Sequence, residues 1–148
     1  MPGANTCAHQ RAFLLSRTTQ MAKFKFGSHP KTFHHVVKFK TLDGVQQEMK
    51  VEYNFRTRSQ FGEFFDKMRD EATKERGGAE LTDMSMSEIM EATRANNGQY
   101  ILGALASWEL EDDLNAANAQ RLADEYPAAA DAVMEAYRKA CLEGRLGN

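Results

Sequence analysis

The feature that most constrains the fold is a change of hydrophobic period near residue 56. Before it, two segments alternate apolar and polar residues, which predicts β-strands. Asp43-Gly44 separates them and favours the tight primed turn of a β-hairpin, because glycine adopts positive φ at low steric cost. After it, apolar residues recur every three or four positions, which predicts helices. The residues predicted to share one face of the hairpin are Phe33, His35, Val37, Phe39, Met49, Val51, Tyr53 and Phe55.

The first helical pattern follows the hairpin directly. Thr57 or Ser59 is expected to cap its start and Gly77-Gly78 to end it. We expect this amphipathic helix to lie against the hairpin. Its apolar positions are Phe61, Phe64, Phe65, Met68 and Ala72.

A second helical pattern begins near Ser85 or Ser87 and reaches Trp108. Gly98 costs about 1 kcal/mol relative to alanine within a helix, so the pattern fits one long helix or two. Trp108 is expected to close the helix by packing into the core. The apolar and small positions are Met86, Ile89, Met90, Thr93, Tyr100, Ile101, Ala104 and Leu105.

Two further helices are predicted after the acidic residues. Asn115 caps the first, which ends near Glu125, and Pro127 suits the first turn of the last, which ends before Gly144. Ala130, Val133, Met134, Tyr137 and Cys141 lie at helical spacing in the last one. The predicted fold class is therefore α+β, with an N-terminal β-hairpin or small antiparallel sheet followed by a bundle of four to five helices.

Length and composition indicate one globular domain. The 148 residues are 42% hydrophobic and 27% charged, which is close to average for a soluble protein. No apolar run approaches the roughly 20 residues that cross a bilayer. Residues 1–21 lack sustained periodicity and are expected to be a disordered or upstream-start extension, with a single domain over 22–148.

The charges are distributed unevenly. Residues 1–40 carry seven Lys or Arg and no acid, whereas the remainder carries 12 Lys or Arg against 21 Asp or Glu. A nucleic-acid-binding adaptor that uses the basic N-terminal segment is one alternative function. The basic residues of this segment are spread thinly rather than clustered. Phe24 and Phe26 alternate with Lys23 and Lys25, which suits an extended strand as well as a base-stacking surface.

The acidic stretch Glu109, Glu111, Asp112 and Asp113 directly follows the only tryptophan. One interpretation is a metal-dependent or acid-base enzyme that uses these carboxylates, another is a solvated helix junction, and a third is a partner-binding surface. The stretch lacks the central glycine and distal glutamate of an EF-hand loop. No cofactor motif is present, and Cys7 and Cys141 have no spacing typical of a zinc site.

The other candidate residues are methionines and histidines. Met84, Met86 and Met90 form a soft apolar patch that either packs in the core or binds a partner helix. His34 and His35 are neighbours on a predicted strand, so they point to opposite faces and do not share a metal.

The C-terminal third resembles a known family. Its motifs, in order, are Trp108 before the acids, a helix entered at Asn115 to Asn118, the Leu-x-x-x-Tyr-Pro step of Leu122, Tyr126 and Pro127, the Ala136-Tyr137 pair, and Gly144, Arg145 and Asn148. Together with the hairpin and the Phe-rich helix, this order resembles the small tail assembly chaperones of tailed bacteriophages, over roughly residues 22–148.

The resemblance implies a non-catalytic protein that has no cofactor. It implies binding to the tape measure protein, recruitment of tail tube subunits, and a place in the host cytoplasm rather than in the finished tail. Candidate partner-binding residues are Glu109, Glu111, Asp112, Asp113, Met84, Met86 and Met90, and Trp108, Tyr126, Pro127 and Tyr137 are expected to be structural. Self-association through the hairpin edge is left open.

Overall fold

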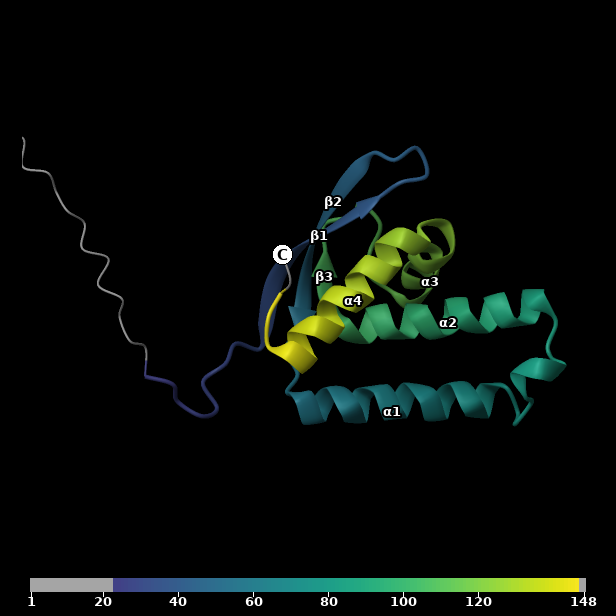
Figure 1. The fold of residues 1–148 in the computed structure, drawn as a ribbon, viewed down its shortest axis with the longest axis horizontal. Helices are drawn as coiled ribbons and strands as arrows, with labels where there is room; N and C mark the ends of the chain where they lie inside the picture. The colour runs from purple at the N-terminus through teal and green to yellow at the C-terminus, as the bar shows by residue number, and fades with distance from the viewer. Residues whose placement is uncertain (1–22, 147–148) are drawn as a thin grey trace, which may run out of the picture.

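The computed structural model describes residues 23–146, so the expected extension at residues 1–21 lies outside the described part of the chain. In Figure 1 the strands form one layer, α4 lies across it, and α1 and α2 run side by side. The elements are β1 (Thr32–Lys40), β2 (Gln46–Asn54), α1 (Arg58–Glu75), a 3-10 turn η1 (Leu81–Asp83), α2 (Met86–Ala104), β3 (Leu105–Trp108), α3 (Ala116–Glu125) and α4 (Pro127–Glu143). The predicted α+β class, with a small antiparallel sheet and four α-helices, is confirmed.

The predicted hairpin is present, with β1 and β2 in antiparallel register from Thr32 opposite Asn54 to Lys40 opposite Gln46. The predicted two-residue primed turn is wrong. The loop has three residues, 42–44, and is closed by a 3.0 Å hydrogen bond from the Thr41 N–H to the Val45 carbonyl. A type I′ turn needs positive φ at both central residues. Here only Gly44 has positive φ, at 79°, which is typical of a three-residue loop.

The inner face of the hairpin is apolar, as predicted, and it packs on α4. Tyr53 is fully buried, and its hydroxyl donates a 2.8 Å hydrogen bond to the Val133 carbonyl in α4. The rings of Tyr53 and Tyr137 stack with centroids 5.2 Å apart. The Tyr137 hydroxyl donates to the Asn54 carbonyl at 2.9 Å, so α4 is bound to β2 at two points.

Helix α1 does not lie against the hairpin, which corrects the prediction. Its buried half packs instead on α2 and α4, where the Phe64 ring lies 5.6 Å from that of Tyr100 and 6.4 Å from that of Tyr137. The Arg56 guanidinium lies 4.1 Å from the centroid of the Phe64 ring and donates a 2.8 Å hydrogen bond to the Gly103 carbonyl in α2. Because α4 already covers the inner face of the sheet, the aromatic stripe of α1 finds its partners on helices.

The predicted helix boundaries are confirmed at their caps. Thr57 caps α1 in a capping box with Gln60, and Ser85 caps α2 in a capping box with Glu88. Asn115 caps α3 by accepting from the Asn118 N–H at 2.9 Å. These caps satisfy N–H groups that have no partner within the helix, which is why short sequence signals identify them.

Helix α2 is one continuous helix through Gly98, and this resolves the alternative of one helix or two. The glycine is explained by packing, because a Cβ at this position would lie 2.5 Å from the Cγ of Gln120 in α3. A Cβ at Gly103 would lie 2.5 Å from the Cε2 of Phe64 in α1. Two glycines therefore let α2 approach α3 on one side and α1 on the other.

The C-terminal end of α2 differs from the prediction. The helix ends at Ala104, and the next four residues form β3, which pairs antiparallel with β2 with Trp108 opposite Val51. Trp108 is partly buried against the core as a strand residue rather than as the closing residue of a helix. The second edge of β2 supplies backbone hydrogen bonds that a local helical pattern cannot reveal.

Candidate functional site

The acidic residues lie in the loop that follows β3. Trp108 holds this loop closed, because its indole N–H donates a 2.7 Å hydrogen bond to the Asp112 carbonyl oxygen. The Asp113 carbonyl accepts from the Asn118 amide at 2.8 Å. Within residues 23–146 the carboxylates of Glu111, Asp112 and Asp113 form no ion pair and no hydrogen bond, and all three residues are exposed.

Glu109 differs from the other three acids. Its backbone N–H donates to the Lys50 carbonyl at 3.1 Å, and its carboxylate accepts from the Lys50 N–H at 3.3 Å. Glu109 therefore continues the edge of the sheet beside β2. The structure thus leaves three carboxylates free in the loop and assigns the fourth a local structural contact.

The placement of the histidines and acids bears on the enzyme alternative. In the part of the chain from 23 to 146, no three His, Cys, Asp or Glu side chains are arranged to hold a metal ion. His34 is exposed and His35 faces the core side of β1, as predicted from strand geometry. Burial lowers the pKa of His35 below its usual value.

The last two helices meet at Tyr126, which is 53% exposed. Tyr126 ends α3, and Pro127 occupies the first turn of α4. Trp108 and Tyr126 both line a small cavity of about 80 Å³ beside α3. Tyr137 is fully buried in α4, and burial raises its pKa to about 12.

The three candidate methionines differ in exposure. Met84 is half-buried, whereas Met86 and Met90 are 70% and 55% exposed one turn apart on α2. Only Met84 lines the main groove of the molecule. Met86 and Met90 lie beside this groove, on the outer part of α2.

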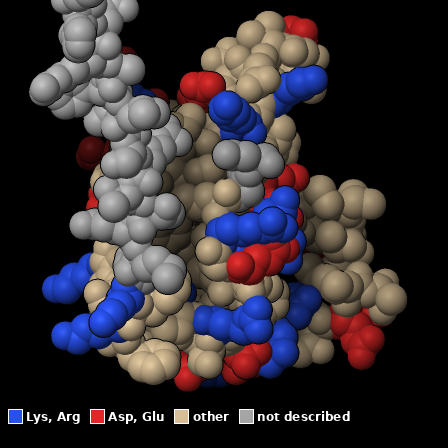
Figure 2. All heavy atoms as spheres, turned by 60° about the vertical axis from the view of Figure 1, so that its left-hand side comes forward, with Lys and Arg blue, Asp and Glu red and all other residues tan. Residues whose placement is uncertain are grey.

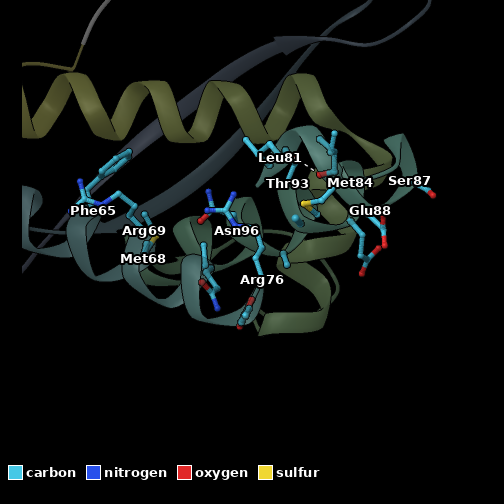
Figure 3. A pocket seen from close by; sticks show the side chains of 17 residues that line it. Phe65, Met68, Arg69, Arg76, Leu81, Met84, Ser87, Glu88, Thr93 and Asn96 are labelled. Atoms are coloured by element: carbon cyan, nitrogen blue, oxygen red, sulfur yellow. Dashed lines mark hydrogen bonds between the residues drawn. The ribbon is translucent and has the colours of Figure 1, made fainter. Parts of the chain in front are cut away.

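The main groove lies between α1 and α2 and has a volume of about 710 Å³ (Figure 3). The two helices pack directly where Gly103 meets Phe64, and they enclose the groove towards η1. Its apolar lining comes from α1, from α2 and from the connection through η1, namely Phe65, Met68, Ala72, Leu81, Met84, Ile89, Ala92 and Ala95. Phe65 is 50% exposed and Leu81 is 53% exposed, so apolar surface faces solvent here.

Charged side chains lie at different positions along the groove. In Figure 3, Arg69 lies beside Phe65 and Met68, Arg76 lies in the middle, and Glu88 lies at the opposite end beside Met84. The Nε of Arg76 is buried and has no hydrogen-bond acceptor within residues 23–146. Hydrogen bonds from the Ser85 N–H and hydroxyl lower the pKa of Glu88 below its usual value.

This groove was not predicted from the sequence. Phe65 and Ala72 were expected on the core face of α1, and no functional residue was expected in η1. One signal was available, because five apolar positions on α1 make a wider stripe than one neighbouring element covers. Which part of that stripe is exposed to solvent depends on how α1 packs on α2.

The face of the molecule shown in Figure 2 has no continuous run of side chains of one charge. Lys and Arg side chains lie beside Asp and Glu side chains across that face. Nucleic-acid-binding domains usually gather Lys and Arg on one face or helix.

None of the helices in the described residues is both long and apolar enough to span a membrane.

The geometry defines a small α+β protein whose most open features are an apolar groove between helices and a free acidic loop, and surfaces of this kind bind other proteins. A family model described as phage tail assembly chaperone matches residues 21–148. The chain belongs to this phage tail assembly chaperone family, and the membership supports a non-catalytic role in tail assembly. Searches of curated proteins and of solved structures gave no match.

Proposed function

We propose that the chain binds the tape measure protein of its phage, keeps that protein soluble before assembly and helps recruit tail tube subunits. The family match over residues 21–148 carries this proposal, because it covers the whole described fold. The protein would act in the host cytoplasm and would be absent from the finished tail. The exposed apolar surface on α1 and η1 supports binding to a protein rather than to a small polar substrate.

The acidic loop is the proposed electrostatic part of this contact. Three adjacent carboxylates repel one another, and surface charges add little to folding stability. Complementary charges accelerate association and select partners, so the loop would attract basic segments of the tape measure protein. The exposure of Glu111, Asp112 and Asp113, which form no ion pair within the described chain, supports this role.

Co-expression tests the proposal. The tape measure gene of the same phage is expressed with and without this chain, and the soluble fraction of the tape measure protein is measured. We expect the chain to raise that fraction and to be recovered with the tape measure protein on a pulldown at low salt. Equal solubility with and without the chain, together with no recovery, would contradict the proposed function.

A metal titration addresses the enzyme alternative. A ligand that binds only the native state at 100 times its dissociation constant adds about 2.7 kcal/mol to the free energy of unfolding. We expect no such increase with Mg²⁺, Ca²⁺, Mn²⁺ or Zn²⁺ in a thermal melt. An increase of that size, lost when Glu111 and Asp112 are replaced, would support a metal site in the loop instead.

A further inference from the structure

The two walls of the groove are the helices α1 and α2. Because the backbone hydrogen bonds of the walls are satisfied within the helices, a bound segment gains little from adding a strand there. Apolar side chains from both walls and from η1 line the groove, and Phe65 and Leu81 remain half-exposed. This arrangement suits the apolar face of a third helix, which would insert side chains at i, i+3, i+4 and i+7.

The length of the groove sets the size of that helix. Along α1 the lining runs from Phe65 to Glu75, which is a rise of about 15 Å at 1.5 Å per residue. A helix of about three turns covers this length. The volume of about 710 Å³ accommodates several apolar side chains.

The charges around the groove determine the charge of its occupant. Residues 66–94, which form the outer part of the α1–α2 hairpin, contain eight acids and five Lys or Arg. Glu88 lies at the η1 end of the groove, and Glu80 and Asp83 lie on the adjoining turn. These three carboxylates have no ion pair with any residue between 23 and 146. A basic segment therefore complements this end.

The basic side chains of the groove are placed differently. Arg69, at the end nearer the core, is already paired with Asp66 at 3.3 Å and Asp70 at 3.8 Å. The buried Nε–H of Arg76, in the middle of the groove, donates to no acceptor within residues 23–146.

We propose that the α1–α2 groove binds one amphipathic helix of about three turns in the partner protein, with Lys or Arg side chains over the Glu88 end. This inference rests on the proposed function, in which the partner is a tail protein. It adds the surface used and the chemistry of the segment bound. A second copy of the chain is a poorer occupant, because the outer parts of two hairpins would both carry excess acid.

Two designed peptides test the inference on the full-length protein. Both are helical, fluorescently labelled and about four turns long, with the same apolar stripe, and they carry either Lys or Glu beside it. Fluorescence anisotropy measures their binding. We expect the Lys peptide to bind at least about tenfold more tightly than the Glu peptide. Equal affinity for the two, or binding only of the Glu peptide, would overturn the proposal.

Substitutions that fill the groove test whether the peptide binds there. Ala92→Trp places a large side chain in the groove and is expected to weaken the Lys peptide about tenfold or more. Ala117→Trp is the matched control, because Ala117 is exposed on α3 outside the groove, and it should leave affinity within about twofold. Leu81→Glu provides a second test if Ala92→Trp fails to fold, since Leu81 is half-exposed. Unchanged affinity in the folded groove variants would overturn the proposal.

Self-association and the proposed function are separated by two further measurements. Sedimentation should show the same monomeric mass for the parent and Leu81→Glu; a parent dimer that Leu81→Glu dissociates would make a second copy the occupant and overturn the inference. If the tape measure protein binds the parent and Leu81→Glu equally, the groove inference fails and the proposed function stands. If the Lys peptide binds in the groove but the tape measure protein does not bind, the proposed function fails and the groove inference stands.

Discussion

The indole N–H of Trp108 lies 2.7 Å from the carbonyl oxygen of Asp112 and donates a hydrogen bond to it. This bond joins the end of β3 to the middle of the acidic loop. The same tryptophan packs against the core, and the Asn118 side chain holds the Asp113 carbonyl at 2.8 Å, so the loop is anchored to the fold at both of its ends. The acids of the loop therefore extend into solvent from a fixed support.

Two substitutions at Trp108 distinguish the contribution of its packing to the free energy of unfolding from the contribution of its hydrogen bond. Trp108→Phe keeps an aromatic ring and removes the donor, and we expect a loss of about 1 kcal/mol in the free energy of unfolding. Trp108→Ala also removes the packing and should cost about 2 to 4 kcal/mol, less than the upper range for a fully buried residue. Urea denaturation followed by circular dichroism measures both. A Trp108→Phe variant as stable as the parent would show that the bond contributes nothing.

The close approach of Gly103 to Phe64 predicts a sharp response to one methyl group. Gly103→Ala places Cβ 2.5 Å from the Phe64 ring, which is confined by the Arg56 guanidinium and by the rings of Tyr100 and Tyr137. We expect a loss of about 1 to 3 kcal/mol. Gly62→Ala is the matched control on α1, where nothing lies within 4 Å, and it should gain about 0.5 to 1 kcal/mol. Equal stability of the two variants would contradict the packing described for α1.

Charge reversal in the acidic loop tests the proposed electrostatic contact. Glu111, Asp112 and Asp113 changed together to Lys should leave the melting temperature within a few degrees, because exposed surface substitutions change stability by only about 0.5 kcal/mol each. The same variant should recover much less tape measure protein in a pulldown at low salt, and high salt should reduce the difference.

The matched control for this reversal changes three exposed acids elsewhere. Glu63, Asp124 and Asp131 lie on three different helices and form no ion pair within the described chain. Changing them to Lys alters the net charge by the same amount. Parallel losses of binding in both variants would indicate a general charge effect rather than a contact made by the loop.

Glu52 predicts a dependence of stability on pH. Its carboxylate accepts hydrogen bonds from the hydroxyls of Thr32 at 2.5 Å and Ser107 at 3.0 Å, and these bonds lower its pKa below 4.5. The unfolded chain therefore binds the proton more readily than the folded chain does. The contribution of Glu52 is present above pH 4.5 and is lost as the pH falls through the lower folded value.

A comparison of two variants measures this contribution. Glu52→Gln should be less stable than the parent at pH 7, and the difference should shrink as the pH falls below about 4.5. Ser107→Ala should show a weaker form of the same trend, because it leaves the bond from Thr32. A difference that stays constant from pH 7 to pH 3 would show that the hydrogen bonds do not favour the ionised carboxylate.

Much of the fold was predictable because its signals are local. Period-two alternation identified both strands of the hairpin, and side-chain oxygens at Thr57, Ser85 and Asn115 identified three helix starts. Each cap bonds to an N–H within the next three residues, so the information is contained in a few adjacent positions. The structural positions of Tyr126, Pro127 and Tyr137 followed from the same kind of local spacing.

Only the tertiary structure decided the end of α2 and the location of the groove. The sequence through Leu105 and Trp108 fits a helix locally, but the open edge of β2 converts it to a strand by supplying backbone partners from more than 50 residues away. Likewise, the apolar stripe of α1 was evident in the sequence, whereas its division into a packed half and an exposed half was not. That division depends on where Phe64 meets Gly103, a contact between distant segments that no local period encodes.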